Sequence, residues 1–166
     1  MNDRAHEAAT ASRDLVARAL ALEVIPFGYR IGYLAQLFTG PLYREMAETQ
    51  DIGRQEWIVL FCTAHFEGLT AQQIAEMSGR AKANVSRAVN KLLRMELLAR
   101  RPDPADARRA LIDITPAGRT LFEQSIGPFI AREREMLSVL TANEIAELGR
   151  ILRKLTERSD GWDAAY

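Results

Sequence analysis

Residues 69–118, LTAQQIAEMSGRAKANVSRAVNKLLRMELLARRPDPADARRALIDITPAG, hold the pattern that decides the fold. Thr70 and Gln73 fit a capping box, in which each side chain satisfies a free backbone N–H at the start of a helix. Ser78 and Gly79 then end this first, short helix. A second helix follows, and its buried face is predicted from apolar residues at helical spacing: Val85, Ala88, Val89, Leu92 and Leu93.

Two short apolar runs come after this second helix. Residues 97–101 and 110–114 flank the proline-containing stretch 102–107, a pattern typical of a hairpin with a long tip. A short helix, a turn, a polar-faced helix and a hairpin in this order make a winged helix-turn-helix. The DNA major groove is just wide enough to admit the second helix, and the hairpin lies beside it. The sequence therefore predicts a mainly α-helical fold with a small β-hairpin wing.

Further helix patterns precede this unit. The first dozen residues lack a sustained apolar period, and we expect a flexible arm or a frayed helix start there. An apolar helix from Leu15 should break near Pro26, because the residue before proline disfavours helical geometry. The next helix runs toward Thr49 and is expected to kink at Gly40-Pro41. A mostly buried helix then ends near Phe66.

Helix patterns also follow the hairpin. Thr115 and Pro116 favour a helix start, with threonine as the cap and proline at the first helical position. Thr141 with Glu144 fits a second capping box ahead of a final amphipathic helix. The predicted winged unit is therefore flanked by helices on both sides.

The charge of the chain is unevenly distributed. Over 166 residues, 22 basic and 22 acidic side chains cancel, which taken alone argues against a nucleic-acid binder. Between Arg80 and Arg109, however, nine basic and three acidic residues give a net charge of +6, which leaves −6 for the remainder. Such a chain can touch phosphate with one surface while the rest is not attracted to it.

Several classes of protein are disfavoured. No apolar run approaches the roughly 20 residues of a membrane helix, so we expect a cytoplasmic protein without membrane contact. The single cysteine, Cys62, cannot form an internal disulfide, and it matches no zinc-site spacing. His6 and His65 are too few and too far apart for a metal site or a catalytic pair. We therefore expect no metal, no cofactor and no enzymatic activity.

Three matches carry a family resemblance. Residues 69–75 and 84–92 look like the two helices of a known helix-turn-helix, and Asp106-Ala107-Arg108 is followed, after five residues, by Ile114-Thr115-Pro116-Ala117-Gly118. This last spacing resembles the wing, and the opening of the next helix, in the MarR (multiple antibiotic resistance regulator) family of bacterial transcription regulators. The resemblance covers about Phe27 to Arg158.

The resemblance implies a domain organisation and a function. Residues 14–49 and 116–158 are expected to be N- and C-terminal dimerisation helices, and residues 54–115 the DNA-binding domain, with a flexible arm at 1–13 and a tail at 159–166. A homodimer would bind a pseudo-palindromic operator in double-stranded DNA, with its recognition helices about 34 Å apart. Such a regulator is expected to be a repressor that a small-molecule effector releases from DNA.

Four departures from the family pattern concern local geometry. Glu96 stands where relatives often have glycine, so a left-handed backbone there is expected to be mildly strained. Ala81 is a poor helix cap. Asp51-Ile52-Gly53 replaces a more usual Gly-Leu-Thr, and Pro41 interrupts the family's long first helix.

Six polar residues are expected to project from one side of the recognition helix. Arginine can hold guanine with two hydrogen bonds, asparagine can do so with adenine, and serine reaches bases or phosphate. The alternative interpretation is a solvated helix face, and which residues read bases stays open. The six are Lys82, Asn84, Ser86, Arg87, Asn90 and Lys91.

On the wing, the resemblance implies that Arg108 enters the minor groove, where the negative potential favours arginine. Asp106 would hold the guanidinium of Arg108 in position. Arg101 and Arg109 are expected to contact phosphates. The alternative is an exposed ion pair of little energetic consequence.

The family also binds small aromatic or phenolic effectors between its dimer helices and its DNA-reading unit. Tyr29, Tyr33, Phe38 and Trp57 are the candidates for such a pocket, and the alternative is ordinary core packing. Cys62 invites comparison with relatives that sense peroxide, but its apolar neighbours favour an inert buried thiol.

Two rival functions differ from a DNA-binding regulator. A winged helix used for protein contacts, without specific DNA binding, would need no basic hairpin and would tolerate loss of Arg108. A small helical enzyme would need catalytic motifs, and neither a glycine-rich phosphate loop nor a Ser-His-Asp arrangement is visible in the sequence.

Overall fold

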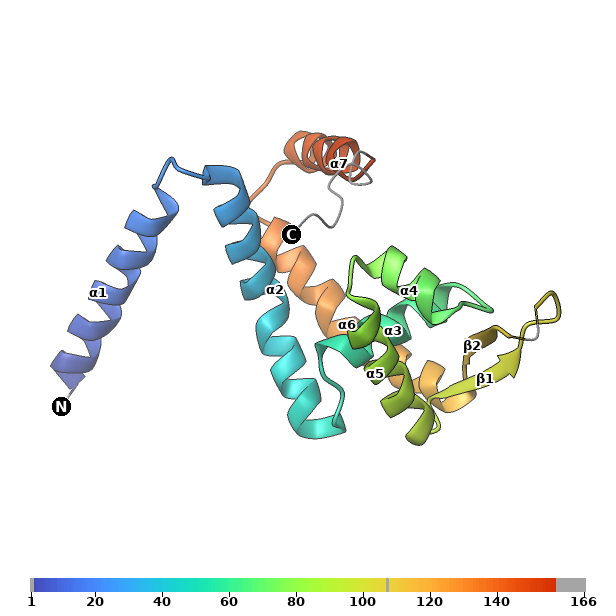
Figure 1. Ribbon diagram of the computed structural model, residues 1–166. Coiled ribbons are helices and arrows are strands. Elements are labelled where there is room, and N and C mark those ends of the chain that lie inside the picture. Colours follow the sequence, from blue (N-terminus) through green and yellow to red (C-terminus); the bar gives the residue numbers. More distant parts are fainter. Residues whose placement is uncertain (1, 107, 158–166) are drawn as a thin grey trace. The chain divides into compact units, whose positions relative to one another are not determined.

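The computed structural model describes residues 2–106 and 108–157 (Figure 1). The chain divides into two units, residues 1–122 and 123–166, which are described separately below. The predicted tail at 159–166 and Ala107 lie outside the described residues. The elements are α1 (Asn2–Leu20), α2 (Pro26–Gln50), α3 (Arg54–His65), α4 (Ala71–Ser78), α5 (Lys82–Arg94), β1 (Leu98–Pro102), β2 (Ala110–Ile114), α6 (Pro116–Leu137) and α7 (Ala142–Thr156). The mainly helical fold with a two-stranded wing is confirmed.

Helix α1 begins much earlier than the predicted start at Leu15. It includes residues 2–13, which were expected to form a flexible arm and are helical in the structure. Alanine, the strongest helix former, occupies positions 5, 8, 9 and 11, so intrinsic propensity favours a helix where no apolar stripe exists. The helix ends at Leu20, and α2 begins with Pro26 at its first position, which confirms the predicted break.

Helix α2 continues through Pro41 to Gln50, so the predicted kink at Gly40-Pro41 does not interrupt the helix. Asp51 then caps its C-terminus in the left-handed region, at φ 55°. The next residue, Ile52, is completely buried. The end of α2 is therefore anchored in the core immediately before α3.

The core of the first unit draws on successive elements of the chain. Helices α3, α4 and α5 pack together, and the two strands lie against α3 and α5 (Figure 1). Burying one aliphatic side chain of this kind contributes about 2 kcal/mol to stability. The largest fully buried aliphatic side chains come from the α2–α3 connection, α3, α4, α5 and β2: Ile52, Leu60, Ile74, Leu92 and Ile112.

Both predicted helix starts around α4 and α5 are confirmed. The Gln73 backbone N–H donates to Thr70 Oγ1 at 3.2 Å, and the Thr70 backbone N–H donates to Gln73 Oε1 at 2.8 Å, which completes the capping box. Ala81 holds the N-cap position of α5, and its methyl group offers no acceptor to the first turn. The start of α5 is therefore less well satisfied than that of α4.

The wing consists of β1, β2 and the connecting residues 103–109. The two strands are antiparallel, with a register from Leu98 opposite Ile114 to Pro102 opposite Ala110. Leu69, just before α4, forms a bridge with Ile112, with backbone N···O distances of 2.8 and 3.2 Å. The base of the wing is therefore bonded to the loop that precedes α4.

A tight junction joins the end of α5 to the start of α6. Glu96 has φ 59°, which confirms the predicted left-handed backbone at a residue other than glycine. Thr115 Oγ1 donates to the Glu96 carbonyl at 2.8 Å and accepts from the Gly118 N–H at 3.0 Å. The Thr115 N–H donates to the carbonyl of Leu97 at 3.1 Å. One threonine thus caps α6 and binds it to the residues that follow α5.

Cys62 is part of the core, with an exposed fraction of 5%. Burial raises the pKa of its thiol, because the low-dielectric surroundings disfavour the thiolate. Its predicted buried position is confirmed, and little of the reactive thiolate is present near neutral pH.

In the second unit, α7 begins at the predicted capping box. The Thr141 N–H donates to Glu144 Oε2 at 2.8 Å, and hydrogen bonds from Thr141 lower the pKa of the Glu144 carboxyl. None of the residues of α7, all of which the structure describes, is buried. No helix among the described residues combines the length and apolarity that a membrane crossing requires.

Gly118 tests the junction between α5 and α6. A Cβ at this position would overlap the Leu97 carbonyl oxygen, so Gly118→Ala must displace backbone. We expect the variant to lose about 2 kcal/mol of unfolding free energy in urea denaturation. Gly127→Ala, on the same helix, is the matched control, because nothing lies within 4 Å of a Cβ there, and its unfolding free energy should differ from that of the wild type by less than about 1 kcal/mol. Equal stability of Gly118→Ala and the wild type would contradict the close approach.

Candidate nucleic-acid interface

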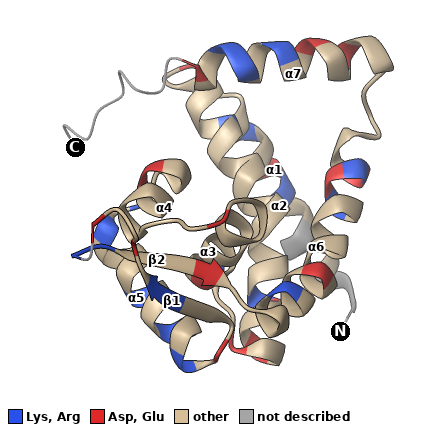
Figure 2. Ribbon diagram, turned by 90° about the vertical axis from the view of Figure 1, so that its right-hand side faces the viewer, with Lys and Arg blue, Asp and Glu red and all other residues tan. Residues whose placement is uncertain are grey.

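Helix α5 separates an apolar face from a polar one. Its buried residues, Val85, Ala88, Val89 and Leu92, confirm most of the predicted stripe. The six predicted recognition residues lie off this stripe: Lys82, Arg87 and Asn90 are exposed, whereas Asn84, Ser86 and Lys91 are half-buried. Figure 2 shows basic residues along α5 and the wing. The packing of α5 therefore holds these polar groups at the surface.

Four polar residues of α5 take part in three side-chain contacts. The Arg87 guanidinium donates to Asn84 Oδ1, one helical turn away. Asn90 Oδ1 accepts from Arg100 Nη2 of β1 at 3.2 Å. Lys91 Nζ lies 2.8 Å from Asp51 Oδ1 at the end of α2. These contacts orient long side chains that would otherwise sample many rotamers.

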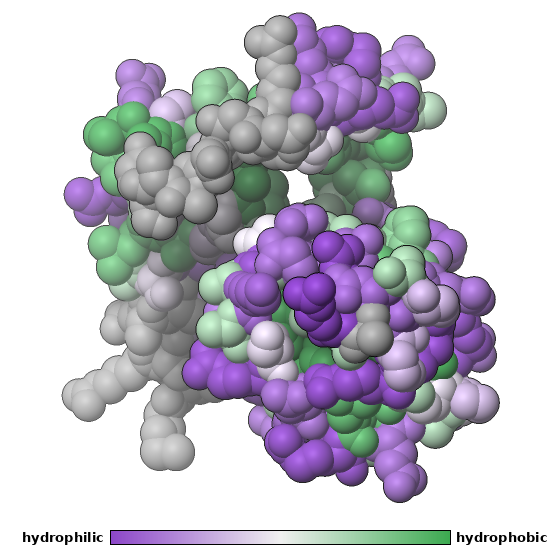
Figure 3. All heavy atoms as spheres, turned by 45° about the vertical axis from the view of Figure 1, so that its right-hand side comes forward, coloured by the Kyte–Doolittle hydropathy of each residue, from purple (hydrophilic) through white to green (hydrophobic). Residues whose placement is uncertain are grey.

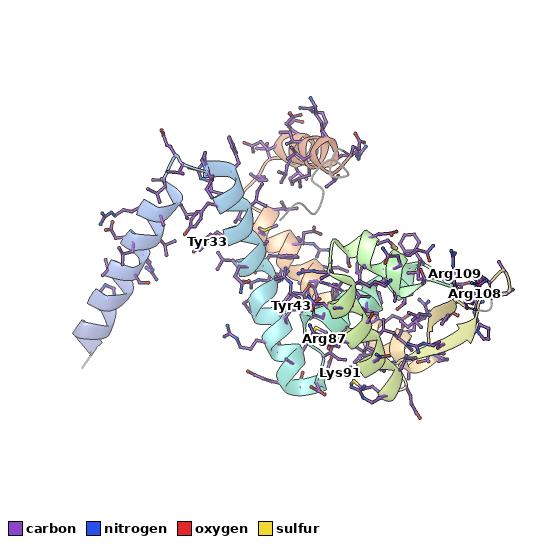
Figure 4. The ribbon with its side chains drawn as sticks, viewed as in Figure 1. Tyr33, Tyr43, Arg87, Lys91, Arg108 and Arg109 are labelled. Carbon is purple, nitrogen blue, oxygen red and sulfur yellow. The ribbon has the colours of Figure 1, made fainter. Side chains whose placement is uncertain are left out.

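The tip of the wing is organised around Asp106. Its carboxylate accepts the Arg108 backbone N–H at 3.0 Å, and it lies 3.4 Å from Arg109 Nε and 3.9 Å from Arg108 Nε. The side chain of Arg108 is 96% exposed, and Figure 4 shows Arg108 and Arg109 in the part of the wing that connects its two strands. Asp106 therefore fixes the backbone of the tip more closely than it holds the guanidinium of Arg108.

Arg100 and Arg101 point to opposite faces of the hairpin, because successive side chains alternate along a strand. Arg100 shares a face with Leu98 and reaches α5 through Asn90. Arg101 shares the other face with Asp113, and its Nε lies 2.6 Å from Asp113 Oδ2. Sequence reasoning proposed Arg101 as a wing residue and did not propose Arg100. Side chains two positions apart on a strand share a face, so the apolar Leu98 indicated that Arg100 lies on the same face as Leu98.

An open depression of about 730 Å³ lies between the start of α4, the start of α5 and the wing. Lys82 and Arg109, which are 27 positions apart in sequence, both line it. Its wall also contains Thr70, Gln72, Gln73 and Asp103. Figure 3 shows that mostly hydrophilic side chains cover the winged unit on the side turned to the viewer. The depression thus joins part of the predicted recognition helix to the predicted wing.

The four predicted effector residues differ in exposure. Tyr29 is exposed, Tyr33 and Phe38 are half-buried on the same helix, and Trp57 of α3 is buried. The ring centroid of Trp57 lies 5.5 Å from that of Phe61 and 6.2 Å from that of Phe122. Ordinary core packing therefore accounts for a large part of the surroundings of Trp57.

Tyr43 of α2 was missed by the sequence analysis, although it contacts Trp57. The two ring centroids lie 6.0 Å apart, edge to face, and the Arg54 guanidinium lies 5.6 Å from the Tyr43 centroid. Burial raises the pKa of the Tyr43 hydroxyl, against the opposing effect of Arg54. Figure 4 shows Tyr33 and Tyr43 on different parts of α2. Sequence reasoning did not reveal Tyr43, because its contact with Trp57 depends on how α2 and α3 lie in the fold.

Comparison with known proteins supports the interpretation of the winged unit. The model of the MarR family matches residues 50–109. The HTH-type transcriptional regulator MhqR of Bacillus subtilis (strain 168) is 30% identical over 100 residues, which are 60% of this chain and 69% of MhqR. The region matched includes α3, α4, α5, β1 and the tip of the wing.

Solved structures show the same fold. The S. aureus MepR–DNA complex is 25% identical and has a TM-score of 0.70, with 79% of this chain and 96% of MepR covered. The PcaV transcriptional regulator of Streptomyces coelicolor, solved with its natural ligand, is 21% identical and has a TM-score of 0.67, with 84% and 96% covered. With its basic helix and wing, the chain thus belongs to the MarR family of DNA-binding transcriptional regulators, which carry a winged helix-turn-helix and are not enzymes.

Proposed function

We propose that this chain is a transcriptional repressor that binds a pseudo-palindromic operator as a homodimer and leaves it when a small aromatic or phenolic effector binds. One observation carries the proposal: the excess positive charge of residues 80–109 is displayed on α5 and the wing of one unit. The rest of the chain has a net charge of −6, so electrostatic attraction directs this surface to DNA.

The polar face of α5 would enter the major groove. Asn84 and Arg87 are bonded to each other, which presents their remaining donors together for base edges. Exposed Lys82 and the half-buried Ser86 are placed near the start of the helix, where they would reach bases or phosphate. Asn90 and Lys91, each held by a neighbouring element, complete the proposed reading surface.

The tip of the wing would reach the minor groove beside it. Arg108 is the residue proposed to enter, because its side chain is almost fully exposed on a backbone that Asp106 fixes. Arg109 lines the depression with Lys82 and would contact phosphate. Arg101 also belongs to the predicted wing set, and its Nε is bonded to Asp113.

A second copy of the chain would cover the apolar surfaces that the flanking helices leave exposed. On α2, Phe27 is 76% exposed, and Ile31 and Leu34 follow at helical spacing. On α7, Ile145, Leu152 and Leu155 form an exposed stripe. Contiguous apolar surface of this kind marks an interaction site, and a two-fold dimer also suits a palindromic operator.

Repression would follow if the bound dimer blocks polymerase. An effector releases DNA only by binding more tightly to a dimer whose wings are wrongly spaced for the operator. The similar fold of PcaV, solved with its natural ligand, supports a ligand-responsive regulator. Tyr29, Tyr33, Phe38 and Trp57 stay the proposed pocket residues, with Tyr43 as a neighbour of Trp57.

Fluorescence anisotropy tests the DNA-binding surface. We expect the wild type to bind DNA from upstream of its own gene more tightly than scrambled DNA, and the affinity to fall steeply with salt as counterions are released. Arg108→Ala should weaken operator binding by about 10- to 100-fold. Arg134→Ala, which removes an exposed arginine of α6, is the control and should bind like the wild type.

Weak and equal binding to both DNAs at low salt would argue against the repressor and for a winged helix that contacts proteins. Normal operator binding by Arg108→Ala would refute the role of Arg108 while leaving the repressor intact.

Light scattering tests the homodimer. Leu152→Glu places a charge in the exposed apolar stripe of α7 and should shift the chain from dimer to monomer, with operator affinity falling at least tenfold at nanomolar protein. Lys154→Glu changes charge on the same helix outside the stripe and should leave the dimer intact. A monomeric wild type, or a dimeric Leu152→Glu, would contradict this surface.

A panel of simple phenols and benzoates tests the effector. At least one compound should raise the operator Kd of the wild type, and Tyr33→Ala should need about tenfold more of it while binding DNA normally without it. A Tyr33→Ala variant with a wild-type response would remove Tyr33 from the pocket.

A further inference from the structure

Asp113 of β2 binds two other segments of the chain with one carboxylate. Its Oδ1 accepts the backbone N–H of Gly68, in the loop before α4, at 2.7 Å. Its Oδ2 accepts from Arg101 Nε of β1 at 2.6 Å. We call these three residues, Gly68, Arg101 and Asp113, the wing clamp. The clamp bonds both strands of the wing to the helix-turn-helix.

Gly68 fits the clamp because it has no side chain. Its φ is +62°, and a Cβ there would come within 2.9 Å of Arg101 Nη2. The adjacent Leu69 forms the backbone bridge with Ile112, so the clamp and the bridge hold neighbouring residues. Side-chain and backbone bonds therefore fix the same point at the base of the wing.

The geometry of Arg101 differs from that of the other basic residues of the wing. Arg108 and Arg109 are at the tip, and Arg100 faces α5, whereas Arg101 lies on the face of the hairpin that carries Asp113. The Arg101 side chain is 49% exposed and that of Asp113 is 28% exposed. A phosphate would have to share or break a short charge-assisted hydrogen bond to reach this guanidinium.

We propose that Arg101 and Asp113 are positioning residues, which set the direction of the wing relative to α4 and α5 and so place Arg108 against DNA. This inference rests on the proposed contact between the wing and DNA. It replaces a phosphate contact for Arg101 with a role that acts through Arg108. It also assigns a function in DNA binding to an acidic residue, Asp113, which electrostatics alone would make unfavourable beside DNA.

The sign of the effect of Asp113→Asn separates the two roles. Asparagine has the same shape and still offers an oxygen to the Gly68 N–H, but it loses the ion pair with Arg101. If charge alone matters, removing a carboxylate from the wing strengthens DNA binding. If the clamp positions the wing, operator binding weakens, by about tenfold for one lost charge-assisted bond.

Glu67→Gln is the matched control for Asp113→Asn. Glu67 lines the same small depression as Arg101 and Asp113, but it contributes no bond to the clamp as defined. Asp113→Asn and Glu67→Gln each remove one negative charge from the lining of this depression. We expect Glu67→Gln to bind operator as tightly as the wild type or slightly more tightly.

Substitutions of Arg101 provide the second test. A phosphate contact tolerates Arg101→Lys, and its loss in Arg101→Met weakens operator and scrambled DNA equally. The clamp requires Nε–H beside Asp113, so Arg101→Lys and Arg101→Met should both lower the ratio of operator to scrambled affinity about tenfold. The double variant Arg101→Met/Asp113→Asn should be no weaker than either single variant, because both remove the same interaction.

These measurements use the whole chain, and thermal unfolding verifies that each variant is folded. Arg108→Ala shows how much operator affinity is lost when the proposed contact between the wing and DNA is removed. Asp113→Asn with wild-type or tighter operator binding, or additive effects in the double variant, would overturn the clamp. If Asp113→Asn does not fold, wild-type selectivity in Arg101→Lys overturns it instead. Absence of selective binding by the wild type itself would refute the proposed repressor, a result distinct from failure of the clamp.

Discussion

The arrangement of the polar residues of α5, the proposed DNA-reading surface, depends on the burial of the opposite face of this helix. Val85, Val89 and Leu92 are almost completely removed from solvent against α3, α4 and the wing. A helix of 3.6 residues per turn has one rotation that buries such a stripe, and that rotation brings the other side of the helix to the surface. The identity of the polar residues can therefore vary without changing how they are presented. Packing of the apolar face thus determines which side of α5 is presented to solvent.

The wing needs a different constraint, because a two-stranded hairpin is only marginally stable alone. Here its base is joined to the loop before α4 by the Leu69–Ile112 bridge and by Asp113. Its tip extends beyond these bonds and is held by Asp106. The support of the wing is thus concentrated at the base, while the exposed arginines are at the far end. The base and the tip of the wing are therefore held by separate sets of bonds.

Local features of the fold could be predicted from the sequence, and non-local ones could not. The capping boxes at Thr70 and Thr141 and the hairpin follow from residues that are close in sequence. The left-handed backbone at Glu96 was expected from the family resemblance, because relatives often have glycine at this position. By contrast, the partners of Asp113, Arg101 and Gly68, are 12 and 45 positions away, and no short sequence pattern predicts these contacts. Helix α1 was missed at its start because propensity, not amphipathicity, favours it.

The junction at Thr115 also decides where the molecule can bend. Its hydroxyl and amide bond the carbonyls of Glu96 and Leu97, and Gly118 leaves no room between the two segments. The first turn of α6 and the end of α5 therefore form one rigid body. If two copies of the chain pair as proposed, a change in the spacing of their α5 helices cannot arise from bending at this junction. Any rotation of the first turn of α6 would therefore also rotate the end of α5.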